Sequence, residues 1–495
     1  MEYNLSKQSI GYCDKFLDTV NEQIVDADIT LPDYCPDIEK ILKCTLIPKI
    51  YSRNVSGGQL TIDGVAVIRI LYCDSIRHNL RCYEHTSDFS ATFNLKTTPQ
   101  QYIVLGDAKC EYINCRALSP RKLVIHGAFS LYAKVLAKSS YDVFDFEEDC
   151  DLQTKKQHIG MSDMCSLFQE QFLFDDDINL SKPIESMLSY DVQTTICELK
   201  SVSNKLMLSA QLKLSALYLS DIDSGETEHL ISTFEINKIF DCDTEVEDAV
   251  NMPELELMSC DVKIRNDTLK NTSSLNLDAK LCFSCVSYAN REVEILSDVY
   301  STKYVTEEKR NLLSCECNHR CIDLSHIVKS KLSVDGTKIK KMLDIYCESI
   351  NISPVLSDNT LALSGKANIC MLIADTNDAP CYVERSVEID YKPESFDPFD
   401  RVQMGKSSVK SISFRLVDEE NVEVRMEIVI SMMVCDALSI NPVVSVSADE
   451  NICVEKCDSA LVMYFADKGE DLWDIAKAYN TKKELLLSEN SLDKN

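Results

Sequence analysis

The sequence predicts a mainly β protein with three tandem β-rich, sandwich-like repeats, followed by a small α+β module at its C-terminal end. Apolar and polar residues alternate over long stretches, and three stretches of similar pattern recur at matched spacing. Alternation with a period of two residues is typical of antiparallel strands that bury one face. The last residues differ, because their apolar positions recur with the period of a helix.

Three short apolar motifs mark the repeats. Each begins with isoleucine and ends with leucine about one helical turn later; the leading residues are Ile38, Ile184 and Ile339. Strand-like segments follow these isoleucines at the same sequence spacing in each copy, around Ile62, Leu208 and Leu363. Equal spacing at two anchor points in three copies indicates an internal repeat. We expect each motif itself to form a short helical turn.

Each copy also has a second half in which apolar and polar residues alternate. The clearest segments are 123–131, 275–283 and 422–430. Together with the motif spacing, they place the domain boundaries, since each repeat is large enough to be a domain. The predicted units are repeat 1 with an N-terminal segment (1–150), repeat 2 (151–312), repeat 3 (313–442), a linker (443–460) and the C-terminal module (461–495).

The C-terminal module begins with an apolar run of strand length, 461–465, and Gly469 allows a turn after it. Asp471 stands at the N-cap position of a first helix, whose apolar face includes Trp473. We expect Trp473 to be a core residue. A second helix is expected to begin at Thr481, where a threonine followed three positions later by glutamate forms a capping box.

This pattern resembles the LysM module, a small βααβ domain. The matching residues are Tyr464, Gly469, Leu472, Trp473, Ile475, Ala476, Tyr479, Glu484, Leu485, Asn490, Ser491 and Leu492. The second strand of that family is apparently absent here. Either a piece of the module is missing from this sequence, or a strand must come from elsewhere.

The LysM resemblance implies a binding groove between two loops. It assigns partner binding to Asp467, Lys468, Gly469, Glu470, Asp471, Leu472 and Asn490. Glycine lets backbone amides approach a ligand closely, and an unpaired first strand could accept a strand of the partner. The alternative is that Gly469 only makes the turn and that the open edge reflects a truncated sequence.

The balance of charges excludes some partners. The chain has 51 basic and 80 acidic residues, a formal charge of −29, which argues against nucleic acid and against an anionic membrane surface. This charge fits a cationic or neutral partner, or it serves solubility alone. No secretory signal and no apolar run of about 18 residues is visible. We therefore expect a cytoplasmic protein without a transmembrane segment.

Catalytic motifs and cofactor motifs are not found in the sequence, and we expect neither enzymatic activity nor a cofactor. The densest ligand-like cluster is Cys315, Cys317, His319 and Cys321. Thiolate and imidazole are zinc ligands, but this spacing is not that of a standard zinc finger, so boundary thiols without metal are expected. The acidic run 241–248 is expected to be a solvated loop rather than a cation site.

The repeat resembles a domain of unknown function that occurs in tandem in anaerobic endospore-forming bacteria. The residues of this resemblance are 28–32, 36–42, Gly64, Leu71 and Tyr72, all in the first copy. Such repeats followed by a LysM module resemble the SipL-like family of clostridial spore coat morphogenesis proteins. That resemblance implies a non-enzymatic scaffold in the mother cell, at the forespore surface. It also implies that the tail docks a spore morphogenetic ATPase of the SpoIVA type.

The alternative function is binding of peptidoglycan, the usual task of LysM modules, which hold chains of N-acetylglucosamine. The cysteines and the missing signal favour the scaffold. A glycan ligand lies outside the membrane, where cysteines are expected to form disulfides.

We predict that the 23 cysteines are reduced. Many lie in apolar strand patterns, where a thiol packs as a small apolar group. Thiol titration of the denatured protein without reductant should count close to 23 free thiols. A largely oxidised protein would favour the glycan-binding alternative.

Overall fold

Extended strands dominate the computed structural model, which confirms the predicted mainly β fold. The structure describes residues 5–146, 151–243, 247–267, 272–334, 336–357, 360–393, 397–455, 459 and 461–491. Within these residues, 20 strands and two short helices form. Six three-stranded antiparallel sheets pair into three sandwiches, and a seventh sheet has two strands.

Sandwich 1 packs two sheets around one apolar core. The first sheet has the order β1-β6-β5, with β1 (Leu5–Thr30), β6 (Lys122–Phe146) and β5 (Tyr102–Ser119). The second is a meander of consecutive strands, β2 (Ile38–Ser56), β3 (Gln59–Asp74) and β4 (Leu80–Asn94). Both sheets supply core residues, among them Ile62 and Phe129, which are fully buried.

Sandwiches 2 and 3 repeat this design. In sandwich 2 the sheets are β11-β12-β7 and the meander β8-β9-β10; the strands are β7 (Leu152–Leu180), β8 (Ser186–Val202), β9 (Lys205–Asp221), β10 (Glu226–Asp241), β11 (Val250–Asp267) and β12 (Thr272–Ser301). In sandwich 3 they are β14-β19-β18 and the meander β15-β16-β17; the strands are β14 (Leu313–Ser333), β15 (Ile339–Ser357), β16 (Thr360–Asp375), β17 (Pro380–Tyr391), β18 (Arg401–Leu416) and β19 (Asn421–Ile440).

The three strand positions chosen from sequence fall at corresponding places. Ile62, Leu208 and Leu363 each lie in the middle strand of a meander and are buried. The prediction of helical turns at the three motifs is wrong. Residues from Ile38 and from Ile339 enter strands directly, because their backbone amides bond to distant chain segments rather than within a local turn. The domain boundaries themselves stay a prediction.

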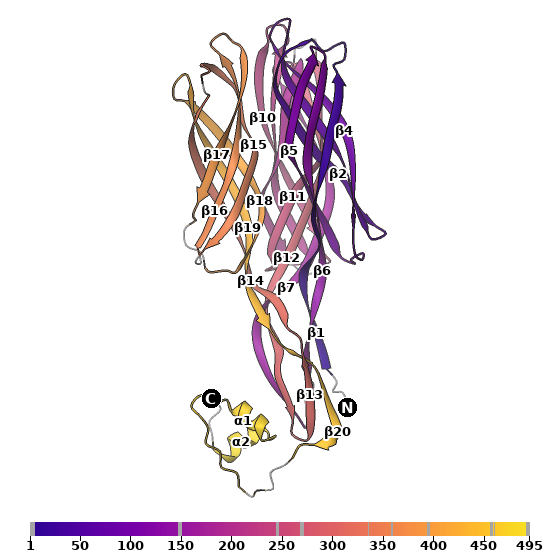
Figure 1. Cartoon of the computed structure of the whole chain (residues 1–495), viewed down its shortest axis with the longest axis vertical. Helices are drawn as coiled ribbons and strands as arrows, with labels where there is room; N and C mark the ends of the chain where they lie inside the picture. The colour runs from indigo at the N-terminus through magenta and orange to yellow at the C-terminus, as the bar shows by residue number, and fades with distance from the viewer. Residues whose placement is uncertain are drawn as a thin grey trace.

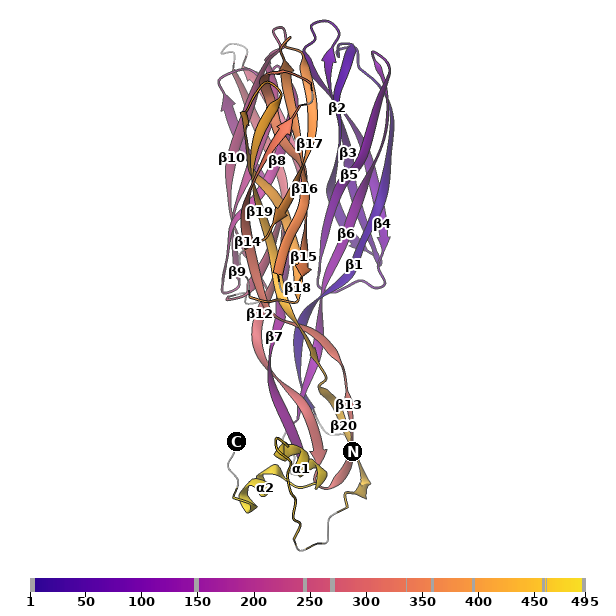
Figure 2. The ribbon, with the colours of Figure 1, turned by 60° about the vertical axis from the view of Figure 1, so that its left-hand side comes forward.

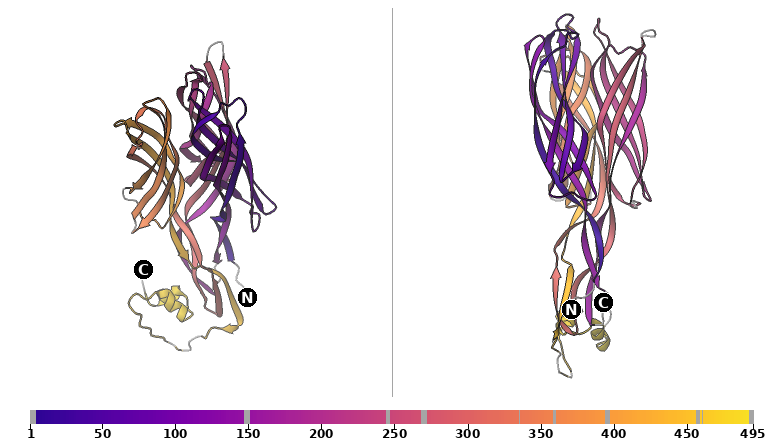
Figure 3. Two further views of the ribbon diagram at one scale, coloured as in Figure 1. Left: turned by 45° about the horizontal axis from the view of Figure 1, so that its top comes forward. Right: turned by 90° about the vertical axis from the view of Figure 1, so that its right-hand side faces the viewer.

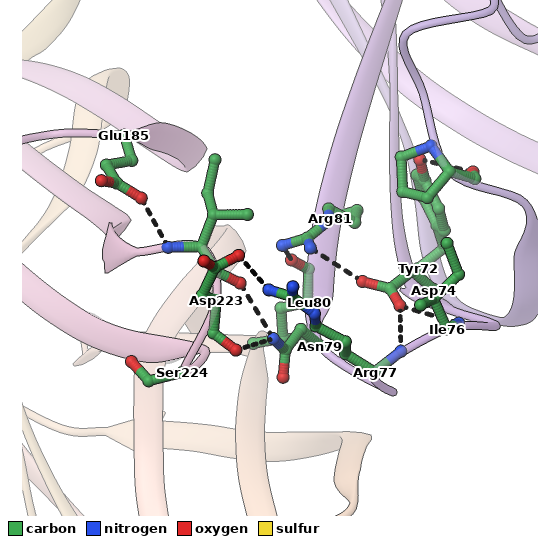
Figure 4. A network of polar contacts seen from close by, with 12 residues as sticks. Tyr72, Asp74, Ile76, Arg77, Asn79, Leu80, Arg81, Glu185, Asp223 and Ser224 are labelled. Atoms are coloured by element: carbon green, nitrogen blue, oxygen red, sulfur yellow. Dashed lines mark hydrogen bonds and ion pairs between the residues drawn. The ribbon is translucent and has the colours of Figure 1, made fainter.

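The turn after the middle strand of each meander is built alike. Asp74, Asp221 and Asp375 end these strands, and each carboxylate accepts hydrogen bonds from backbone amides of its own turn. Aspartate stabilises tight turns in this way. In sandwich 1 the turn also contacts sandwich 2, since the Asn79 amide donates to the carbonyl of Ile222 at 3.0 Å (Figure 4).

The three sandwiches lie side by side, and their long strands continue into a narrower stalk below them (Figures 1 and 2). Their meanders share one apolar cluster, to which the leucines that end the three motifs contribute: Leu42, Leu188 and Leu343. The stalk contains the ends of β7 and β12, together with β13 (Tyr304–Arg310) and β20 (Val443–Cys453). Strand β20 pairs with β13, so the segment expected to be a linker is partly a strand.

Truncation of Leu208 should destabilise the protein, because its side chain is 2% exposed and lies in the core of sandwich 2. Leu208→Ala should lower the free energy of unfolding by about 2–5 kcal/mol. The neighbouring Met207 is 42% exposed on the opposite face of β9, and Met207→Ala should cost about 0.5 kcal/mol or less. Urea denaturation followed by circular dichroism measures both; equal losses would contradict the assigned core face.

Candidate functional site: the C-terminal helices on the stalk

The tail ends in two short helices, α1 (Leu472–Ala478) and α2 (Lys483–Glu489). The expected N-cap of α1 is present, because the Asp471 carboxylate accepts a hydrogen bond from the amide of Trp473 at 2.9 Å. The expected capping box of α2 is wrong. The helix begins one residue later than the motif requires, so Lys482 occupies the cap position and makes no side-chain cap bond.

The apolar run 461–465 forms no strand, contrary to the sequence prediction. A strand needs a neighbour to satisfy its amides and carbonyls, and none of the described strands pairs with this run. Its side chains are exposed instead, including Met463 and Phe465, which is 85% exposed. The tail therefore presents an exposed apolar segment whose backbone amides and carbonyls pair with none of the described strands.

Trp473 is a core residue, as expected, but its core includes the stalk as well as the helix pair. The indole is 5% exposed and packs edge-to-face on Tyr300 of β12, with ring centroids 4.9 Å apart. Its Nε1 donates to a carboxylate oxygen of Asp298 at 2.7 Å. A buried tryptophan whose N–H is satisfied fixes both the position and the orientation of the helix that carries it.

Asp298 is the polar centre of this contact. Besides Trp473, it accepts a hydrogen bond from Lys477 of α1 at 2.7 Å and pairs with Arg310 of β13 at 3.1 Å. Burial raises the pKa of Asp298, but the bonds from Lys477 and Trp473 outweigh burial, so its pKa lies below the ordinary value. Its contribution to docking is therefore present above about pH 4 and is lost as the pH falls through the lowered pKa.

Two further contacts hold the tail on the stalk. Lys155 of β7 pairs with Asp471, and this hydrogen bond is the main reason why the pKa of Asp471 is lowered. The hydroxyl of Tyr300 donates to the carbonyl of Thr481 at 2.7 Å, between the two helices. The contact thus involves α1, the α1–α2 turn and the strands β7 and β12 of the stalk. In Figure 3 the two helices lie near the end of the stalk that points away from the sandwiches.

The binding residues expected from sequence fall into two groups. Most are exposed: Asp467, Lys468, Gly469, Glu470 and Asn490. The other two, Asp471 and Leu472, are half-buried, and Asp471 pairs with Lys155 of the stalk. In the exposed loop, the Glu470 carboxylate accepts the amide of Asp467 at 3.0 Å and the hydroxyl of Tyr464. Gly469 has a φ of +88°, which glycine adopts without strain, and no atom lies within 4 Å of the place of a Cβ.

The cysteine cluster singled out from sequence does not converge. Cys317 and Cys321 donate to different backbone carbonyls, those of Asp436 and Asn251. Cys315 is buried among apolar side chains of the stalk. His319 lies instead beside Glu316 and Cys435, a group that sequence spacing could not bring together because Cys435 is on another strand. Within the described residues, no disulfide joins two cysteines.

Comparison with known protein families gives a match to part of the chain. Residues 37–118 match the family model described as "SipL, SPOCS domain". This segment covers the meander of sandwich 1 and most of β5, and it confirms the resemblance predicted from the first repeat. No curated protein and no solved structure matches the chain at a significant level. Among the described residues, helices that combine the length and apolar character needed to cross a bilayer are absent.

Removal of the Asp298 carboxylate should loosen the tail from the stalk, because the indole N–H and Lys477 would lose their partner. Trp473 is the only tryptophan, so its fluorescence reports this contact. Asp298→Ala should shift the emission to longer wavelength and increase quenching by iodide. Glu294→Ala, on the same strand, is the matched control and should leave the spectrum unchanged. An unchanged spectrum for Asp298→Ala would show that the carboxylate does not hold the tail.

Proposed function

We propose that the protein is a non-enzymatic scaffold of spore coat assembly that docks a coat protein through the exposed side of its tail. The match of residues 37–118 to the SipL SPOCS family supports a role in coat morphogenesis. The observation that carries the docking proposal is the orientation of the tail. Its tryptophan faces the stalk, and its glycine loop faces solvent.

The stalk contact supports recognition by presenting the loop in one orientation. Trp473, Lys477 and Asp471 of α1 are engaged with the stalk, so the helix cannot rotate freely. Ordering a binding segment in advance lowers the entropy that association costs. The loop 467–470 is left available to a partner, with Gly469 offering backbone amides at close range.

The apolar run before the loop supplies a second means of recognition. Residues 461–465 have no strand partner among the described residues, and their apolar side chains are exposed. A partner strand added here would satisfy the amides and carbonyls and would bury those side chains. Affinity would then come from the backbone ladder and specificity from the loop.

The partner implied by the resemblance is a coat-basement ATPase of the SpoIVA type. The formal charge of −29 makes a partner with a basic or neutral docking surface the better match. The sandwiches act in this proposal as a rigid body that carries the tail at one end (Figure 1). Their other surfaces remain for further coat proteins.

Charge reversal in the loop tests the proposal. Asp467 is exposed, so Asp467→Lys should leave the tryptophan fluorescence unchanged while lowering the affinity for the purified ATPase at least about tenfold, or about 1.4 kcal/mol, because the new cation would face a basic docking surface. Asp88→Lys, at an exposed position of β4 in sandwich 1, is the matched control and should bind like the parent. Pull-down and calorimetric titration measure both.

Binding of chitin oligomers is measured in the same experiment. Chitin oligomers should not bind the parent protein at micromolar concentration. The proposal fails if they do so while Asp467→Lys recruits the ATPase as well as the parent does.

A further inference from the structure

A bulge in β14 buries a histidine at the junction of sandwiches 2 and 3. The pairing of β14 with β19 shifts register between Cys317 and Arg320. Within this bulge Asn318 adopts a φ of +55°, a left-handed conformation that is uncommon for residues other than glycine. The bulge places His319 inside, where it is 3% exposed. Bulges re-aim side chains, and they are over-represented beside functional sites.

Sandwich 2 holds this histidine in place from two sides. The imidazole of His319 stacks on the ring of Tyr288, with centroids 3.9 Å apart and ring planes 7° from parallel. Asn290 clamps the backbone, because its amide oxygen accepts the His319 N–H and its amide nitrogen donates to the His319 carbonyl, each at 3.2 Å. The ring stack and the two backbone hydrogen bonds therefore fix the position of His319.

Three metal-ligating side chains meet at this point. A carboxylate oxygen of Glu316, a ring nitrogen of His319 and the sulfur of Cys435 all lie within 4.8 Å of one another. The Nδ1 atom of His319 is buried and has no hydrogen-bond partner in the structure. The ring nitrogen that faces the Glu316 carboxylate is the other one, Nε2, at 3.3 Å.

The other comparable group in the described residues is already filled by the chain itself. Glu348, Cys370 and Glu384 also form a ligand-like group, but Lys43 of sandwich 1 pairs with both of its carboxylates. Around Glu316, Arg401 pairs with Oε1 at 2.9 Å, and Oε2 lies 3.3 Å from Nε2 of His319. One carboxylate oxygen is therefore directed to the histidine side of the group.

A cavity of about 390 Å³ lies next to this group. It is lined by Asn290, Asn318, Arg320, Asp397, Pro398 and Asp436. These include both chain neighbours of His319 and the residue after Cys435. Glu316 itself is half-exposed, so an ion can reach the group from solvent, as a usable metal site requires.

We propose that Glu316, His319 and Cys435 form a binding site for zinc or a similar divalent cation at the junction of sandwiches 2 and 3. Carboxylate, imidazole and thiolate are established zinc ligands, and a water can complete a four-coordinate sphere. On binding, the S–H bond of Cys435 breaks, a sulfur–metal bond forms and the proton passes to solvent. The bound ion would fix His319 and so hold the two sandwiches together.

Cobalt titration of the full-length, chelator-treated protein tests the site, because Co²⁺ bound to thiolate absorbs in the near ultraviolet. The parent should bind Co²⁺ with a sulfur charge-transfer band, and zinc should displace it. Cys435→Ser should abolish this band, and His319→Gln should weaken binding at least about tenfold. Cys321→Ser and His326→Ala, both on β14 but outside the group, should behave like the parent.

Folding is monitored by circular dichroism and by the fluorescence of Trp473. The parent protein alone gives a second test: saturating zinc should raise its unfolding temperature, since a ligand that binds only the native state stabilises it. The proposal is overturned if the parent shows no sulfur charge-transfer band, or if folded Cys435→Ser keeps the spectrum and affinity of the parent.

Discussion

The pairing of β7 with β12 is the constraint on which the rest of the structure depends. These two strands run through sandwich 2 and continue into the stalk. Side chains of one strand pair therefore contribute to two separate apolar cores. In the sandwich, β12 buries alternate residues, but residues 281–288 are buried on both faces where the sandwiches meet. Register shifts at Ser287/Tyr288 and at Leu296/Asp298 then change which side chains point to which neighbour. The second shift precedes the carboxylate and the tyrosine that receive the tail.

The three sandwiches are alike in design, but different contacts join each pair of them. Equivalent leucines from the three motifs meet in one apolar cluster, to which each sandwich contributes in the same way. The polar contacts differ from one interface to the next. Lys43 of sandwich 1 pairs with acidic residues of sandwich 3, whereas His229 of sandwich 2 pairs with Asp344 of sandwich 3. Non-directional apolar burial can be shared among copies, while charged pairs specify which copy lies next to which.

Local patterns were sufficient for some features. Period-two alternation predicted the strands, because burial of one face is recorded in each strand's own residues. The helix beginning after Asp471 was predictable for the same reason, since its cap lies next to it. The error at Ile38 and Ile339 has the opposite cause. Their short apolar spacing suits a helical turn as well as a strand, and only bonds to distant segments decide between them.

Contacts between distant segments could not be predicted in this way. Nothing near Trp473 indicates that its partners are Asp298 and Tyr300, because the contact depends on how far the stalk extends below the sandwiches. Likewise, the cysteine that lies beside His319 is on β19, while the cysteines next to it in sequence point elsewhere. Sequence reasoning identified Trp473 and His319 but not the distant residues that lie beside them.

The alignment of long strands with the axis of the molecule has a mechanical consequence. Hydrogen bonds in an antiparallel ladder lie perpendicular to the strands. A pull between the tail and the far end of the sandwiches would therefore load many of these bonds in parallel, as shear, rather than one after another (Figure 1). A peeling force across the strands would meet them singly. The molecule is thus stiffest against tension along its own length.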